Sequence, residues 1–175
     1  MSDKINPFEK KKKGVFFFKS SNPYEFYDLL NGKNMDDKQD VWGTLIFPEN
    51  AKKPCPLIIP IHGSAGLREG HHTHMVNLLD AGFAIFRIHH FESRGVISIV
   101  ENQTEVTLAS MITDAFRALT LVSKHPDVDS DKIGIMGWSL GGSTAFYAAW
   151  QPIIDTLTQN LSLIHISEPT RLHGI

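Results

Sequence analysis

Residues 131–150 read DKIGIMGWSLGGSTAFYAAW and contain the pattern Gly-x-Ser-x-Gly at Gly137, Ser139 and Gly141. An apolar run before the pattern predicts a short strand, and the residues from Leu140 onward predict a helix. A serine on such a sharp strand-to-helix turn has strained backbone geometry, which small neighbours permit and which exposes its hydroxyl. We therefore expect Ser139 to be a nucleophile at the carboxyl edge of a sheet, rather than part of a purely structural turn.

Strand-like and helix-like patterns alternate along the rest of the chain. Two segments rich in β-branched and aromatic residues predict an antiparallel pair, and two nearly continuous apolar runs predict strands covered on both faces. These four segments are 14–19, 41–47, 56–61 and 83–88. Amphipathic periodicity predicts helices around 75–79 and over 105–124, and DVDSD at 127–131 predicts a turn. The order predicts an α/β fold with a mostly parallel sheet and helices on both faces.

Composition narrows the class of protein and of partner. The chain has 175 residues, of which 42% are hydrophobic and 21% charged, as expected for one globular domain. Its formal net charge of -2 produces no overall positive potential that would attract nucleic acid or an anionic membrane, so we expect a small-molecule substrate. The single cysteine, Cys55, agrees with a reducing compartment. We find no apolar run of membrane-spanning length or signal peptide, and we expect a cytoplasmic protein with a flexible basic N-terminus over 1–13.

A serine nucleophile needs N–H donors for the oxyanion that forms when it attacks a carbonyl group. The predicted turn aims the backbone N–H of Leu140 at that place, because this residue begins a helix. The sequence HGSAG at 62–66 follows a predicted buried strand and forms a loop around Gly63. We predict that the N–H of Ser64 is the second donor of this oxyanion hole.

Two further residues are candidates for a substrate pocket. Trp138 directly precedes the nucleophile and either lines the acyl pocket or packs beneath the turn. Arg94 follows the strand predicted at 83–88, and it either contacts a substrate carboxylate or anchors its own loop. The sequence leaves both pairs of alternatives open.

Several histidines fall near these loops and raise the question of a metal site. They are His71, His72, His74, His89 and His90. Adjacent histidines diverge on a helix, and a serine nucleophile needs no ion, so we expect neither a metal nor a cofactor. We expect His62 to have a structural hydrogen-bonding role beside the oxyanion loop.

Three segments together resemble the α/β-hydrolase superfamily, and more particularly its dienelactone-hydrolase-like members. These segments are IIPIHGSAGL, FRIHHFESRGV and DSDKIGIMGWSLGGSTA. The resemblance implies hydrolysis of ester, lactone or related acyl bonds, with Ser139 followed along the chain by a catalytic acid and then a histidine. Dienelactone hydrolases proper use cysteine where this chain has serine. The alternatives are a non-catalytic binding protein of the same fold and a peptidase of the prolyl-oligopeptidase type.

The residues after the predicted elbow helix do not fit a catalytic acid and histidine. Asp155 follows the elbow too soon for another strand to precede it. The sequence LSLIHISEPTR at 161–171 resembles a translated sequencing-library adapter. We therefore expect an incomplete α/β-hydrolase domain over 14–160, a non-native tail over 161–175, and negligible activity. The alternative is a genuine strand that brings His165 toward the nucleophile.

Overall fold

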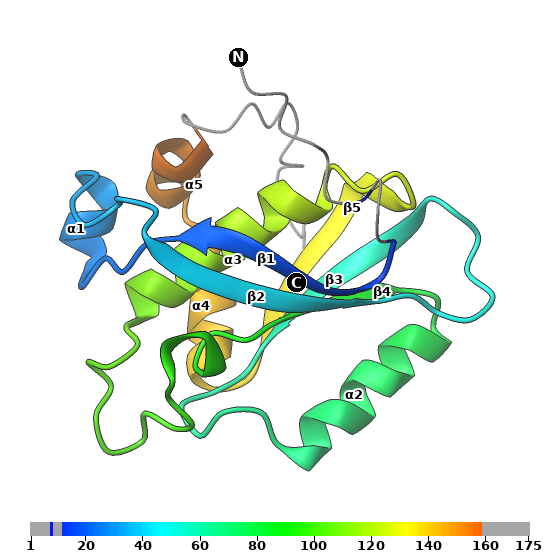
Figure 1. The fold of residues 1–175 in the computed structure, drawn as a ribbon, viewed down its shortest axis with the longest axis horizontal. Helices are drawn as coiled ribbons and strands as arrows, with labels where there is room; N and C mark the ends of the chain where they lie inside the picture. Colours follow the sequence, from blue (N-terminus) through cyan, green and yellow to red (C-terminus); the bar gives the residue numbers. More distant parts are fainter. Residues whose placement is uncertain (1–7, 9–11, 159–175) are drawn as a thin grey trace, which may run out of the picture.

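A five-stranded sheet with the order β1-β2-β4-β3-β5 lies at the centre of the fold (Figure 1). The strands are β1 (Gly14–Ser20), β2 (Gln39–Ile46), β3 (Cys55–Ile61), β4 (Ala84–Ile88) and β5 (Val128–Gly137). β1 runs antiparallel to β2, and β2 runs antiparallel to β4. β3 lies parallel to both β4 and β5. The predicted α/β fold is confirmed, and the antiparallel contact of β2 with β4 makes the sheet a mixed one.

The computed structural model describes residue 8 and residues 12–158. Most of the predicted N-terminal segment, 1–13, and all of the predicted tail, 161–175, lie outside the described residues. The tail includes His165, so the alternative that makes this residue a base stays a prediction.

Helices cover both faces of the sheet, as Figure 1 shows. They are α1 (Phe26–Leu30), α2 (Glu69–Asp80), α3 (Leu108–Val122), α4 (Leu140–Ala148) and α5 (Gln151–Thr158), with a 3-10 turn η1 (Glu92–Arg94). α2 packs against β4 on one face, and α3 crosses the other face and contacts α4. No helix in the described part of the chain is long and apolar enough to span a membrane.

The main hydrophobic core lies between α3 and the sheet. Met111 and Ala115 of α3 are fully buried and belong to the same cluster as Leu45, Phe86 and Ile88 of the strands. Burial of such side chains contributes roughly 1.5–3 kcal/mol for each large one. α3 begins at Leu108 because the hydroxyl of Thr107 accepts the N–H of Ser110 at 3.1 Å and caps the helix. The helix is therefore shorter at both ends than the predicted span 105–124.

Two local predictions were wrong or incomplete. The segment 127–131 is not a free turn, because β5 already begins at Val128, opposite Cys55 of β3. The N–H of Cys55 donates to the carbonyl of Asp127 at 3.0 Å, so pairing with the neighbouring strand overrides the turn-forming composition. The connection between β1 and β2 also contains α1, which the sequence analysis did not predict.

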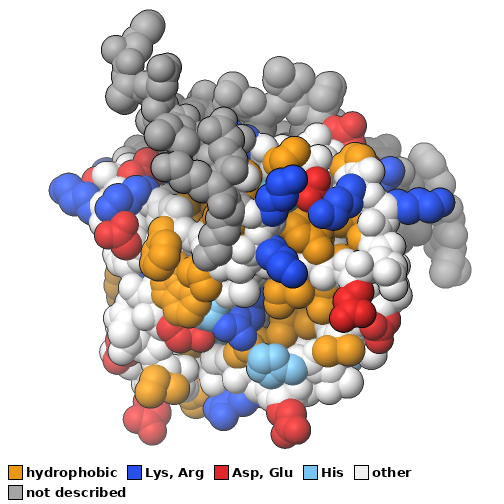
Figure 2. Space-filling view, turned by 45° about the vertical axis from the view of Figure 1, so that its right-hand side comes forward, with side chains coloured by type: hydrophobic (Ala, Val, Ile, Leu, Met, Phe, Trp, Pro, Cys, Tyr) orange, Lys and Arg blue, Asp and Glu red, His pale blue; other side chains and the backbone are white. Residues whose placement is uncertain are grey.

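The outer edge of β5 has no strand beside it among the described residues. Ile133, Ile135 and Met136 of this strand are only half-buried. On the face drawn in Figure 2, hydrophobic side chains reach the surface between acidic and basic ones, and neither charge sign covers the face alone. An open apolar strand edge of this kind favours aggregation.

Candidate active site

Ser139 lies on a sharp turn between the end of β5 at Gly137 and the start of α4 at Leu140. Its backbone has φ 53° and ψ −119°, a combination that L-residues rarely adopt. The Ser139 residue is exposed, and no hydrogen bond holds its hydroxyl within the part of the chain that the structure describes. The geometry is that of a strained, accessible serine at the carboxyl edge of the parallel strands.

Glycine is needed on both sides of Ser139 because backbone segments approach very closely. A Cβ atom at Gly137 would lie 2.1 Å from the carbonyl group of Gly141. A Cβ atom at Gly141 would lie 2.1 Å from the carbonyl oxygen of Ile61, at the end of β3. The turn therefore packs closely against β3, and any side chain at Gly137 or Gly141 would push the neighbouring backbone segments apart.

The loop after β3 lies directly against Ser139. A Cβ atom at Gly63 would lie 3.1 Å from the Cβ of Ser139. The carbonyl of Ser64 accepts the N–H of Ile99 at 2.8 Å and the hydroxyl of Ser98 at 3.3 Å, which fixes the orientation of this loop. No acceptor among the described residues occupies the N–H of Ser64 or of Leu140. Both donors are therefore free, and their role as an oxyanion hole stays a prediction.

Among the described residues, no histidine paired with a carboxylate contacts the side chain of Ser139. Asp155 is on α5, where one of its carboxylate oxygens accepts the side-chain amide of Gln151 at 2.7 Å. The remaining acidic and histidine side chains that follow it, Glu168, His165 and His173, lie outside the described residues.

The guanidinium of Arg94 is engaged inside the protein. Its two terminal nitrogens donate to both carboxylate oxygens of Asp114 at 2.8 and 3.0 Å. Its Nε donates to Asn22 at 2.9 Å, and a terminal nitrogen also reaches the carbonyl of His90 at 2.9 Å. These contacts anchor the loop after β4, which fits the structural alternative for Arg94, and a contact with substrate stays a prediction.

Asp114 is the centre of a buried polar network that the sequence analysis did not predict. It is completely buried on α3 and accepts Ser20 Oγ at 2.5 Å and His90 Nδ1 at 2.8 Å, in addition to Arg94. Burial alone would raise the pKa of this carboxyl, but the hydrogen bond from His90 and the charge of Arg94 lower it below its usual value. The one available signal was an acidic residue on the otherwise apolar stripe of the helix at 108–122.

His62 lies behind the oxyanion loop, where it is buried. Its Nδ1 lies 3.0 Å from the carbonyl oxygen of Gly63 and donates to it. Burial, followed by the electrostatic effect of the neighbouring His90, lowers the pKa of His62 to about 4, so the His62 ring is neutral at physiological pH. The Nε2 atoms of His62 and His90 have no partner among the described residues. His62 therefore has the position of the structural residue that we predicted.

Trp138 packs against the first turn of α2. Its indole stacks on the imidazole of His71, with ring centroids 4.4 Å apart and an interplanar angle of 23°. The ring of His74 is farther away, at 5.8 Å. No group of three or more potential metal ligands is present in the described residues. The histidines of α2 are thus arranged around an aromatic side chain.

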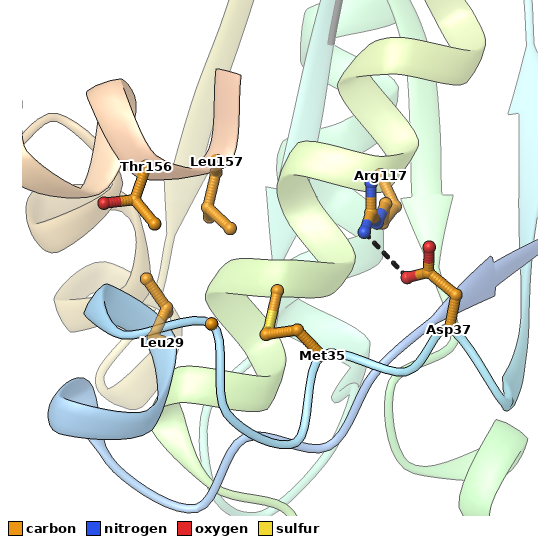
Figure 3. Close-up of a pocket in the computed structure, with 7 residues that line it drawn as sticks. Leu29, Met35, Asp37, Arg117, Thr156 and Leu157 are labelled. Carbon is orange, nitrogen blue, oxygen red and sulfur yellow. Dashed lines mark hydrogen bonds and ion pairs between the residues drawn. The ribbon is translucent and has the colours of Figure 1, made fainter. Parts of the chain in front are cut away.

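A cavity of about 240 Å³ lies away from Ser139, between α1, α3 and α5 (Figure 3). Leu29, Met35 and Leu157 form its apolar wall. At its other end, Arg117 donates to the carboxylate of Asp37 at 2.7 Å. None of the predicted site residues lines this cavity.

Residues 44–170 match the model of the BD-FAE family. No curated protein matches the chain. Among solved structures, a protein described as a dienelactone hydrolase from Klebsiella pneumoniae has a TM-score of 0.55 at 18% identity, over 79% of this chain and 56% of that one. The dienelactone hydrolase-like promiscuous phosphotriesterase P91, from metagenomic libraries, has a TM-score of 0.54 at 18% identity, over 78% of this chain and 54% of that one.

A third solved structure has higher sequence identity to this chain. It is Est1E from Butyrivibrio proteoclasticus with ferulic acid bound, and its TM-score is 0.51 at 28% identity. The match covers 63% of this chain and 43% of Est1E. The chain therefore spans about half the length of these proteins.

Proposed function

Because the chain belongs to the BD-FAE family, we propose that it carries the nucleophile and the oxyanion hole of a serine hydrolase that cleaves carboxylic esters. The observation that carries this proposal is the backbone of Ser139, with φ 53° on an exposed turn. Such a conformation costs about 1–3 kcal/mol and persists only where its surroundings enforce it. A non-catalytic binding protein has no use for that strain, so the geometry favours catalysis over this alternative.

The reaction would begin when Ser139 Oγ attacks the carbonyl carbon of the ester. The carbonyl oxygen would become an oxyanion that accepts the N–H groups of Leu140 and Ser64. Loss of the alcohol would leave an acyl group on Ser139, and attack by water would then release the acid. One donor of such a hole is worth roughly 10²–10³ in rate.

Proton transfer needs a base that the described residues do not place on Ser139. We propose that a histidine and its orienting acid come from sequence outside the described residues, after the nucleophile in chain order. Without them a serine hydroxyl is a weak nucleophile at neutral pH. Where no histidine reaches Ser139, turnover of esters should therefore be negligible.

Esters of aromatic acids are the substrates to test first. Est1E, a protein of similar fold, was solved with ferulic acid, an aromatic acid. In this chain Trp138 precedes the nucleophile and is partly exposed. We propose that its ring forms one wall of the acyl pocket, with lactones as a second substrate class and no cofactor.

A single-turnover acylation experiment tests this proposal in the chain as it exists. The chain is incubated with an activated ester, 4-nitrophenyl acetate, and the acetylated peptide is located by mass spectrometry. We expect a slowly formed adduct on Ser139 that persists, because none of the described residues places a base on Ser139 for deacylation.

The Ser139→Ala variant should lose this adduct, whereas the control Ser143→Ala should retain it, since Ser143 lies one turn along α4. Equal labelling of the Ser139→Ala variant would contradict the assignment of the nucleophile. Absence of any adduct on Ser139 would favour the non-catalytic alternative.

A further inference from the structure

The first turn of α2 is capped by an imidazole. The N-cap residue is Arg68, whose side chain has no hydrogen-bond acceptor. Three residues later, Nδ1 of His71 accepts the backbone N–H of Arg68 at 3.1 Å. Glu or Gln usually makes this contact in a capping box. His71 thus performs the task of an acidic or amide side chain with a group that can lose its acceptor by protonation.

The same imidazole covers the side chain next to the nucleophile. The backbone of Trp138 is held at both ends, because its N–H donates to Ile61 at 3.0 Å and its carbonyl accepts Gly141 at 2.9 Å. These contacts fix the backbone of Trp138 but not the orientation of its indole ring. His71 stacks on it at 4.4 Å, so one ring joins the start of α2 to the nucleophile turn.

The hydrogen bond to Arg68 fixes the tautomer of His71. An imidazole nitrogen that accepts an N–H carries no proton, so the proton of the neutral ring is on Nε2. A second proton would go onto Nδ1 and place two donors face to face. Protonation therefore breaks the cap and removes the contact that orients the ring.

We propose that His71 is the positioning residue for Trp138, and that it holds the indole beside Ser139 only as the neutral imidazole with its proton on Nε2. The inference rests on the proposed function in one respect, that Ser139 is the nucleophile. In acid, the first turn of α2 loosens and the indole loses its fixed neighbour. The wall of the acyl pocket would then become mobile.

The surroundings of the His71 imidazole determine whether its pKa lies above or below that of an ordinary histidine. Partial burial lowers the pKa of His71, and the charges of His74, His72 and Arg68 lower it further. On the neighbouring β3 loop, His71 in turn contributes to the lowered pKa of His62. Glu69 is the acidic residue in the same turn of α2. The neutral form of His71 therefore prevails at neutral pH, and the ring is protonated only at a lower pH than an ordinary histidine.

The fluorescence of Trp138 reports the state of this stack. The chain has two other tryptophans, and Trp42 itself stacks on His89 with centroids 3.3 Å apart. The variant Trp42→Phe/Trp150→Phe therefore leaves Trp138 as the single emitter. We expect its emission maximum to shift to longer wavelength on acidification, with a midpoint below pH 6.5, because an indole that loses the stacked imidazole becomes more exposed to water.

Two further substitutions in that background separate His71 from its neighbours. His71→Gln keeps an acceptor at the capping position but does not titrate, so it should abolish the transition while circular dichroism shows that α2 persists. His74→Gln is the matched control and should retain the transition. A transition that survives in His71→Gln, or that disappears only in His74→Gln, would overturn the proposal.

Nitrogen-15 spectra of the histidine-labelled wild-type chain give an independent test that needs no tryptophan variant. They should show the His71 proton on Nε2 at pH 7, and a proton on Nδ1 instead would overturn the proposal. Neither measurement uses ester hydrolysis. Failure here would leave the assignment of Ser139 intact, and failure of the acylation test would leave the His71 stack intact.

Discussion

Replacement of Asp114 by asparagine tests whether the buried network after β4 holds the fold together. Asp114 is the only anion in contact with the guanidinium of Arg94 among the described residues, and both side chains are removed from water. In the Asp114→Asn variant the side chain would keep its shape but present an NH₂ group to donors from Arg94 and His90. An uncompensated charge would then remain buried.

The expected loss of folding stability in Asp114→Asn follows from the burial of this ion pair. Breaking a buried ion pair by removing one partner costs about 3–5 kcal/mol. With a urea dependence of about 2 kcal/mol per molar, the unfolding midpoint should fall by roughly 1.5–2.5 M. Because whole domains are stable by only about 5–15 kcal/mol, the variant should be close to unfolding at 37 °C.

Urea unfolding followed by circular dichroism at pH 7 measures this effect. The matched control is Asp36→Asn, because Asp36 pairs with Lys38 at 2.9 Å on the surface. Such an exposed pair contributes little to stability because water and salt screen it, so the control midpoint should barely move. A loss below about 1 kcal/mol for Asp114→Asn would refute the view that Arg94 depends on this carboxylate.

Two further predictions concern the backbone and the pH dependence of stability. Gly137→Ala should prevent soluble expression, because its Cβ would lie 2.1 Å from Gly141. The control is Gly70→Ala, whose Cβ would have no atom within 4 Å. This control should stabilise α2 by about 0.5 kcal/mol, as measured by urea unfolding. The pKa of His62 is about 4 in the folded chain and about 6.5 when unfolded, so the unfolded chain binds the extra proton between these values. Stability should therefore fall by roughly 3 kcal/mol as pH drops from about 6.5 to about 4. Titration of the unfolding free energy should show a shallower slope in His62→Gln, and an unchanged slope would contradict the assignment.

The sequence was sufficient to predict the sharp strand-to-helix turn at Ser139 because its causes are local. Gly137, Ser139 and Gly141 lie within five positions, and the contacts that exclude larger side chains come mainly from this segment and the end of β3. A pattern of residue types over a few positions can encode such a steric requirement. The free N–H groups of Leu140 and Ser64 follow from the same turn and the adjoining loop.

The buried network was not predictable in the same way because its partners are distant along the chain. Asp114 meets Ser20 across 94 positions, His90 across 24 and Arg94 across 20. A single sequence records the residue types but not which of them meet in space. The early start of β5 was missed for a similar reason, since Val128 begins the strand by pairing with Cys55 of β3, and a register shift separates this pair from the next at Ile133.

Among the described residues, the close contacts around Ser139 come from the end of β3, the loop after it and the first turn of α4. The end of β3 contacts Gly141, the loop at Gly63 contacts the serine, and α4 begins with the free N–H of Leu140. In the proposed function, the geometry of attack is therefore built separately from the base that would remove the proton. This separation makes two independent measurements meaningful: formation of an acyl group on Ser139 reports the turn and its donors, and turnover reports the histidine. A chain that acylates but does not turn over would show that a strained serine with its oxyanion donors can form without its catalytic base.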